Sequence, residues 1–415
     1  MKNWIRTSGP NKSLKLSAMA VPILVFSGLA VSATTISLRD EPVAPRKDYN
    51  LRVFQNLRLA FTGSVEVAFE DNANQSEDDA QSSMVVTPRL GVSLHWPINP
   101  HIEIGSGLSL GYEYYTNGDI DSDFIFGFDE SVGTDFKIDW FVGRRSVLRF
   151  EEEFRSQLDV PQVAGQEYVL YRNRMALVYD YPVSEQMILT LKGQQRDTWN
   201  DSDDFEHQEN TTHSVDGLLM WQMNRDTSVG PYARWQNVNY DIDDNPDRQT
   251  MGGGASLVYE PTTRLRAEGS LGFEVMDVDA DDAEEENGVV LSARCGYRSS
   301  PNVTHTFSLR HDRDQDLLDE HADYSRETLL GYDARWQVRK KVYLHGGASH
   351  LTMSQQGDPA DVEEATILRI KAGSSYQMTR QNRLDFNYVR TIRDSDVDNS
   401  SFESNRVSVK YVHDF

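Results

Sequence analysis

The feature that most constrains this chain is a period-two alternation of apolar and polar residues that recurs from about residue 64 to the last residue. About eighteen segments of roughly ten residues show it, which is the weak per-strand signal typical of a barrel. In TTRLRAEGSLGFEV, residues 262–275, Leu265, Leu271 and Phe273 share one parity, whereas Arg266 and Glu268 share the other. Side chains alternate between the two faces of a strand, so the pattern predicts an all-β chain.

The connections between these segments alternate in length along the chain. Short turns such as PINP, NRDT and VRKK interleave with longer acidic stretches such as DIDDNPD and DVDADDAEEENG. In an outer-membrane barrel the periplasmic turns are short and the outer loops long, whereas a Greek-key sandwich has no reason to alternate in this way, and no four-strand propeller repeat is present. The sequence therefore predicts a transmembrane antiparallel up-and-down β-barrel in the bacterial outer membrane, with about 18 strands or alternatively 16, short periplasmic turns and long acidic extracellular loops.

The composition agrees with a structure in which one face of each strand is exposed to water. Hydrophobic residues are 38% of the chain, and the formal net charge is -24. Disorder would share these values, but the regularly spaced aromatic and β-branched residues argue against it. The single cysteine, Cys295, excludes an internal disulfide framework and a thiolate metal site. The negative charge excludes a dominant phosphate-binding surface, so nucleic acid is not an expected partner.

The N-terminus has the features of an export signal. Lys2, Arg6, Lys12 and Lys15 precede the apolar run LSAMAVPILVFSGLAVSA at residues 16–33. A signal peptide over residues 1–33 is predicted, followed by a periplasmic linker at 34–50 and the barrel at 51–415. An uncleaved anchor is the alternative, although the run contains Pro22 and is marginal in length for a spanning helix.

The last strand ends in an aromatic residue. Val407, Val409, Tyr411 and Phe415 share one parity, and Phe415 is the final residue. This resembles the terminal-strand signal that outer-membrane proteins present to the barrel assembly machinery, which is therefore an expected partner during biogenesis.

The parity predicted to face the lumen is rich in arginine. A barrel of this size is wide enough for an aqueous lumen, and guanidinium groups there would favour anions. Pairing of these arginines with acids on neighbouring strands is an equally open interpretation. The predicted pore-lining residues are Arg149, Arg172, Arg174, Arg234, Arg264, Arg266, Arg294, Arg310, Arg335, Arg369, Lys371, Glu268 and Asp333.

The long acidic connections allow two interpretations. They are solvated loops, or they bind Ca²⁺ or Mg²⁺ and bridge to lipopolysaccharide phosphates. The stretch DVDADD begins like a calcium loop, but Asp282 occupies the position of the required glycine and Gly288 that of the glutamate. Residues 116–133, TNGDIDSDFIFGFDESVG, are the connection expected to fold inward if a loop constricts the pore. No cofactor, metal site or catalytic set of residues is predicted, so the chain is not expected to be an enzyme.

The repeating hairpin carries a resemblance to a known family. Residues 229–275, VGPYARWQNVNYDIDDNPDRQTMGGGASLVYEPTTRLRAEGSLGFEV, place a strand with Tyr and Arg before an acidic loop, a Gly-rich strand and a short turn. In this form the chain, from about residue 50 to 415, resembles the putative β-barrel porin 2 family. That resemblance implies an outer-membrane channel, often associated with exopolysaccharide production and export, and it supplies no motif from which residue roles could be transferred.

Together these features predict a porin-like channel for hydrophilic solutes, with anions favoured by an arginine-rich lumen. The alternatives are an outer-membrane component of exopolysaccharide export and a non-conducting surface-binding barrel. The expected partners are outer-membrane lipid and lipopolysaccharide together with a hydrophilic solute or polysaccharide.

Overall fold

The computed structural model describes residues 51–54, 56–77, 80–118, 123–127, 136–143, 145–158, 169–200, 209–240, 247–278, 286–314, 322–357, 364–397 and 400–415. The predicted signal peptide, linker and most of the acidic loop residues lie outside these ranges, and their assignments stay predictions. Within the described ranges no helix is long and apolar enough to cross a membrane.

The regular elements of the described residues are β-strands that alternate polar and apolar positions, as their sequences predict. They are β1 Leu51–Phe54, β2 Leu57–Glu70, β3 Ser83–Asn99, β4 Ile102–Tyr115, β5 Asp123–Gly127, β6 Phe136–Val142, β7 Ser146–Leu158, β8 Val169–Pro182, β9 Met187–Asn200, β10 Asn210–Asn224, β11 Thr227–Tyr240, β12 Arg248–Thr262, β13 Leu265–Val278, β14 Glu286–Ser300, β15 Val303–Asp314, β16 Ala322–Arg339, β17 Val342–Gly357, β18 Glu364–Gln377, β19 Asn382–Ser395 and β20 Phe402–Asp414.

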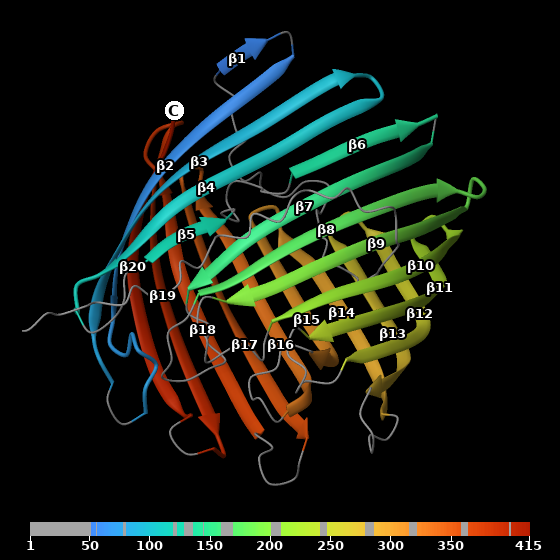
Figure 1. Cartoon of the computed structure of the whole chain (residues 1–415). Helices are drawn as coiled ribbons and strands as arrows, with labels where there is room; N and C mark the ends of the chain where they lie inside the picture. Colours follow the sequence, from blue (N-terminus) through green and yellow to red (C-terminus); the bar gives the residue numbers. More distant parts are fainter. Residues whose placement is uncertain are drawn as a thin grey trace, which may run out of the picture.

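These strands form one closed antiparallel sheet in which chain neighbours are sheet neighbours (Figure 1). Closure is made by β2 and β20, which pair from Thr62 opposite Asp414 to Glu70 opposite Arg406. The amide of Phe415 also donates to the carbonyl of Phe61 at 2.9 Å. Because β1 only extends the edge of β2, and because β5 and β6 share one place between β4 and β7, the ring has eighteen strand positions. The predicted barrel and strand number are thus confirmed.

One strand position is split. Gly127 of β5 lies opposite Ser109 of β4, and Lys137 of β6 lies opposite Gly105 of β4. The ten residue steps from Gly127 to Lys137 therefore correspond to only four steps on β4. The sequence pattern treats residues 116–133 as one loop, because the short FIFG run carries too few alternating positions to be read as a strand. Residues 123–127 of that stretch instead belong to the barrel wall, and residues 128–135 lie outside the described residues.

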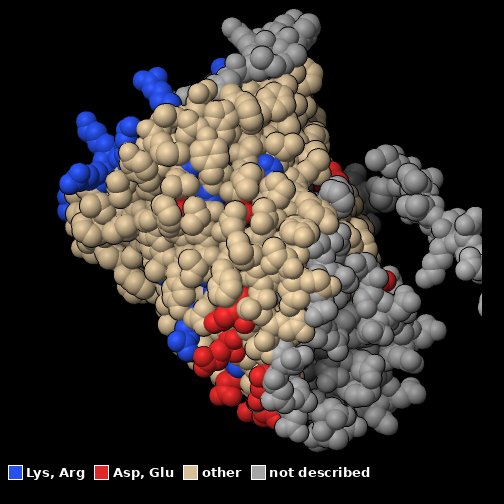
Figure 2. All heavy atoms as spheres, turned by 90° about the vertical axis from the view of Figure 1, so that its left-hand side faces the viewer, with Lys and Arg blue, Asp and Glu red and all other residues tan. Residues whose placement is uncertain are grey.

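The connections keep the predicted alternation of lengths. The short ones hold two to four residues, such as 225–226 between β10 and β11, and the long ones hold six or more, such as 71–82 between β2 and β3. Figure 2 shows most of the visible Lys and Arg toward one end of the face and most of the visible Asp and Glu toward the other, with a largely uncharged band between them. The barrel therefore has a basic short-turn rim and an acidic long-loop rim on this face.

The outer face of the wall is apolar over the height of a membrane. On β13 the outward positions run from Leu265 to Val275 before Asp277, and Leu271 is 57% exposed. Exposed aromatic side chains stand at the short-turn ends of successive hairpins: Trp140, Tyr181, Trp221, Tyr259, Tyr297, Trp336 and Tyr376. Near the opposite ends of β7, β8 and β9, the rings of Phe154, Tyr171 and Trp199 stack on one another. An apolar band between two aromatic girdles is the surface that a transmembrane barrel presents to lipid.

In the described part of the chain, the inner face has no continuous hydrophobic core. Its buried apolar residues form small groups near the long-loop ends of the strands, such as Met276 with Val278 and Val238 with Tyr240. Arg248 stabilises the second group, because its guanidinium lies 4.8 Å from the centre of the Tyr240 ring and donates to the Tyr240 hydroxyl at 3.0 Å. Most of the rest of the inner face is polar, with single apolar residues such as Leu329 among the charged ones, so the wall is held mainly by its backbone ladders and by side-chain pairs.

Candidate functional site

The strand register places the predicted pore-lining residues on the face opposite the apolar belt. Arg234 lies between Asp216 and Gly252 on the neighbouring strands, for example, and Arg310 lies between Ser292 and Leu329. Arg264 differs from the rest, because it is exposed in the short turn between β12 and β13. Whether these residues line a conducting pore stays a prediction.

Many of the inward cations pair with acids on the same or the next strand. Arg149 Nε lies 2.8 Å from Asp139 Oδ1, and Arg310 Nη2 lies 2.7 Å from Glu327 Oε2. Further pairs of the predicted arginines include Arg174 with Glu153 at 2.9 Å, Arg266 with Glu260 at 2.8 Å and Arg266 with Glu268 at 3.4 Å. Pairing along the wall, one of the two interpretations left open by the sequence, therefore accounts for part of the arginine set.

A second kind of pair reaches across an intervening strand over a glycine. Arg234 of β11 and Glu274 of β13 both lie opposite Gly252 of β12, and Arg234 Nη1 is 3.2 Å from Glu274 Oε1. A Cβ atom on Gly252 would come within 3.0 Å of Glu274 Cγ. Neighbouring strands are about 4.8 Å apart, so side chains two strands apart can meet only where the middle position is empty. We call this contact the Arg234–Glu274 bridge.

The same arrangement occurs twice on the wall formed by β16 to β19. Lys371 Nζ lies 2.7 Å from Asp333 Oδ1 over Gly347, where a Cβ atom would lie 2.6 Å from that oxygen. We call this the Asp333–Lys371 bridge. Two residue pairs further along the same strands, His345 Nε2 and Asn387 Oδ1 are 3.0 Å apart over Gly373. In both places the polar side chains lie flat along the wall.

The bridges differ in how much water reaches them. The side chains of Arg234 and Glu274 are 21% and 6% exposed, and the neighbouring Asp216 is fully buried. The side chains of Lys371 and Asp333 are 51% and 49% exposed. Breaking a buried ion pair costs far more stability than breaking a solvated one. The Arg234–Glu274 bridge therefore stabilises the wall, whereas the Asp333–Lys371 bridge is exposed to the lumen.

Arg335 and Arg369 are inward arginines that form no ion pair with an acid in the described part of the chain. Arg335 on β16 and Arg369 on β18 are both exposed. The inward positions of β18 hold Arg369 and Lys371 and no acid. This part of the wall therefore presents more positive than negative charge to the lumen.

A hollow of about 530 Å³ lies at the short-turn end of this wall, on its inner side. We call it the periplasmic hollow. The Asp333–Lys371 bridge over Gly347 and the His345–Asn387 pair over Gly373 both contribute side chains to its lining. The inward polar side chains that line it are Glu66, Asp333, Arg335, Gln337, Tyr343, His345, Lys371, Ser375, Gln377, Arg383, Asp385, Asn387 and Lys410.

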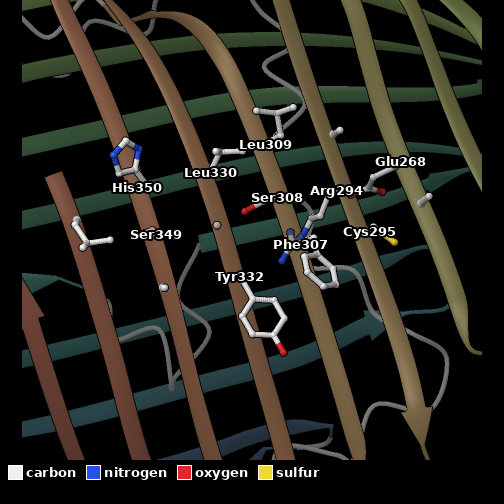
Figure 3. A pocket seen from close by; sticks show the side chains of 15 residues that line it. Glu268, Arg294, Cys295, Phe307, Ser308, Leu309, Leu330, Tyr332, Ser349 and His350 are labelled. Atoms are coloured by element: carbon white, nitrogen blue, oxygen red, sulfur yellow. The ribbon is translucent and has the colours of Figure 1, made fainter. Parts of the chain in front are cut away.

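Another hollow of about 530 Å³ lies on the lipid-facing side of β13 to β18. Figure 3 shows Phe307, Leu330, Tyr332 and His350 around it, on strands β15, β16 and β17. Small residues such as Ala293 line it, and Phe307 and Leu330 are among the exposed apolar side chains of the belt. This hollow belongs to the membrane surface of the barrel and does not open to the lumen.

Sequence reasoning missed the glycines and several of the acids that organise the inner wall. Gly252, Gly347 and Gly373 give no pairing signal of their own, since the pairs they permit connect strands two apart. The sequence signal that could have identified these glycines is their parity, because each occupies a polar-face position of its strand among charged residues. Within the described residues, no group of three His, Cys, Asp or Glu side chains is placed to hold a metal ion.

Comparison with known proteins supports the resemblance seen in the hairpins. Residues 239–415 match the model of the family described as putative beta-barrel porin 2. No curated protein matches the chain.

Similar solved structures are outer-membrane barrels of low identity. The outer membrane protein opdK from Pseudomonas aeruginosa has 11% identity and a TM-score of 0.48, with 86% of this chain and 99% of that chain covered. OccK2 (OpdF) from the same organism has 13% identity and a TM-score of 0.48, with 86% and 98% covered. OccAB3 from Acinetobacter baumannii has 10% identity and a TM-score of 0.47, with 87% and 100% covered. These values are too low to transfer a solute or a residue role.

Proposed function

We propose that this chain, a porin-like β-barrel of the bacterial outer membrane, is a channel through which hydrophilic solutes diffuse and which favours anions. The observation that carries the proposal is the contrast between the two faces of the wall. Exposed Leu271 and Phe273 point to lipid, whereas the opposite face holds ion pairs and free guanidinium groups. Polar groups need water or partners, and the lumen of a barrel with eighteen strand positions is too wide for its own side chains to fill.

The anion preference rests on the wall that contains β16 and β18. Arg335, Arg369 and Lys371 are exposed on the inner face, and of these three only Lys371 forms an ion pair within the described residues. Fixed guanidinium charge at a wall of low dielectric raises the local concentration of anions and lowers that of cations. Since most other inward arginines are neutralised by acids, we expect a moderate preference rather than exclusion of cations.

Planar bilayers test this directly. Purified full-length protein should give discrete conductance steps. Under a KCl gradient, the reversal potential should be displaced from zero toward the equilibrium potential of chloride. The double variant R335Q/R369Q should conduct and shift that potential toward potassium. Absence of conductance in correctly inserted protein would overturn the channel, and cation selectivity of the unaltered protein would overturn the anion preference.

A further inference from the structure

We propose that the periplasmic hollow is a binding subsite for a small hydroxylated monocarboxylate, such as a sugar acid, on its way through the lumen. The inference rests on the proposed channel function and adds to it a place and a ligand class. The hollow is large enough for one sugar ring, because ligand pockets begin at about 300 Å³.

Arg335 is the group that would hold the carboxylate. Its side chain is exposed on the inner face of β16, and it forms no ion pair with any acid of the described residues. A guanidinium presents parallel N–H donors that fit both oxygens of one carboxylate. The other cations around the hollow are already paired, since Lys371 lies 2.7 Å from Asp333 and Arg383 lies 2.9 Å from Asp385.

The acids of the hollow select the rest of the ligand. Asp333 is half exposed beside Lys371, and Asp385 and Glu66 lie directly opposite Lys410 on the two neighbouring strands. Their oxygens accept hydrogen bonds from hydroxyl groups. They repel a second carboxylate, because like charges brought together in a hollow raise the free energy of the complex. A hydroxylated monocarboxylate therefore fits better than a dicarboxylate.

Neutral pairs complete the lining. Gln337 Nε2 donates to the Tyr343 hydroxyl at 3.2 Å, and the ring of His345 is hydrogen-bonded to Asn387. Gln337 and Tyr343 lie opposite each other on neighbouring strands, whereas His345 and Asn387 meet over Gly373, which has no side chain to separate them. Their remaining donors and acceptors, with the Tyr343 ring, suit the mixed polar and apolar faces of a sugar.

The test uses the full-length protein in detergent micelles and saturation-transfer difference NMR with glucuronate, glucose and succinate as probes. Glucuronate should bind with an affinity at least about tenfold higher than glucose, since one charge-assisted pair contributes about 1.5–3 kcal/mol. Succinate should bind more weakly than glucuronate. R335Q should abolish the advantage of glucuronate over glucose, and R335K should restore part of it.

Lys340 supplies the matched control. It is exposed in the short turn after β16 and outside the hollow, so K340Q removes the same charge from the same rim. K340Q should leave the advantage of glucuronate unchanged, and heat-modifiable migration on a gel should show that each variant is folded.

The outcomes separate the two proposals. Equal affinity for glucuronate and glucose, a preference for succinate, or equal losses in R335Q and K340Q would overturn the subsite whether or not the barrel conducts. Selective binding of glucuronate by a barrel that does not conduct would support the subsite and overturn the channel.

Discussion

The Arg234–Glu274 bridge and the Asp333–Lys371 bridge are built in the same way and stand in different surroundings. Each joins a basic and an acidic side chain two strands apart over a glycine, at 3.2 Å and 2.7 Å respectively. The first lies beside fully buried Asp216, and the second lies at the rim of an open hollow. The difference teaches that a charge on the inner wall is not by itself a pore charge. Its exposure decides whether it stabilises the wall or acts on a solute.

The largest expected effect is on stability, at the buried bridge. Arg234→Met removes the guanidinium that pairs with both Asp216 and Glu274 and leaves their carboxylates buried without it. We expect a loss of about 3–5 kcal/mol in the free energy of unfolding. Urea unfolding in lipid vesicles, followed by tryptophan fluorescence, measures it. Lys371→Met is the matched change at the exposed bridge and should cost about 1 kcal/mol or less. Equal losses in the two variants would remove the distinction between the bridges.

A smaller loss of stability is expected at the glycines. Gly252→Ala and Gly347→Ala each place a Cβ atom within 3.0 Å of the acid in their bridge, and overpacking of this kind costs about 1–3 kcal/mol. Gly346→Ala is the control, because its Cβ atom would point to the lipid side and lie 3.4 Å from the nearest backbone oxygen. The same unfolding experiment compares the three. If Gly346→Ala lowers the free energy of unfolding as much as Gly347→Ala does, the missing side chain under the bridge does not explain the loss of stability.

The smallest expected effect is on selectivity, at the exposed bridge. Lys371→Met leaves the carboxylate of Asp333 uncompensated in the lumen and should shift the reversal potential toward cations by several millivolts. Asp333→Asn should shift it in the opposite direction, because Lys371 is then unopposed. The two shifts are compared in bilayers under the same salt gradient, and they should shrink in concentrated salt because screening shortens to about 3 Å at 1 M. Shifts of the same sign would show that the bridge does not face the conducting path.

The sequence predicts the barrel well because its signals are local. Alternation fixes which side of β13 carries Leu271 and which carries Glu268, and turn length fixes which ends lie on the same rim. Prediction from the sequence fails where a contact joins two strands that are not neighbours in the sheet. The pairing of Arg234 with Glu274 over Gly252 requires the register of two successive hairpins, which no period-two pattern contains. The split strand position between β4 and β7 was missed for a similar reason, since residues 123–127 are too short to show alternation.

The candidate site is predictable only in part. Parity places Arg335 and Asp333 on the inner face. It does not show that Arg335 is exposed and forms no ion pair within the described residues, while Arg234 is mostly buried and paired. That difference arises from the glycines and acids around each residue. The roles in polysaccharide export and the contact with the assembly machinery stay predictions, because they depend on partners and not on the wall.

The central claim is that the polar face of the strands lines an aqueous, conducting lumen. The most direct test places single cysteines at Ser349 and Ala348 of β17, in a Cys295→Ala background. Ser349 lies on the inner face opposite Gly331 and Arg369, and Ala348 is exposed on the outer face opposite Tyr332 and Ile370. A water-soluble, negatively charged methanethiosulfonate reagent is added to single channels in a bilayer. If the polar face lines the conducting lumen, S349C should show a permanent stepwise fall in conductance and A348C should show no change. Reaction at A348C alone, or the absence of any conductance to modify, would contradict it.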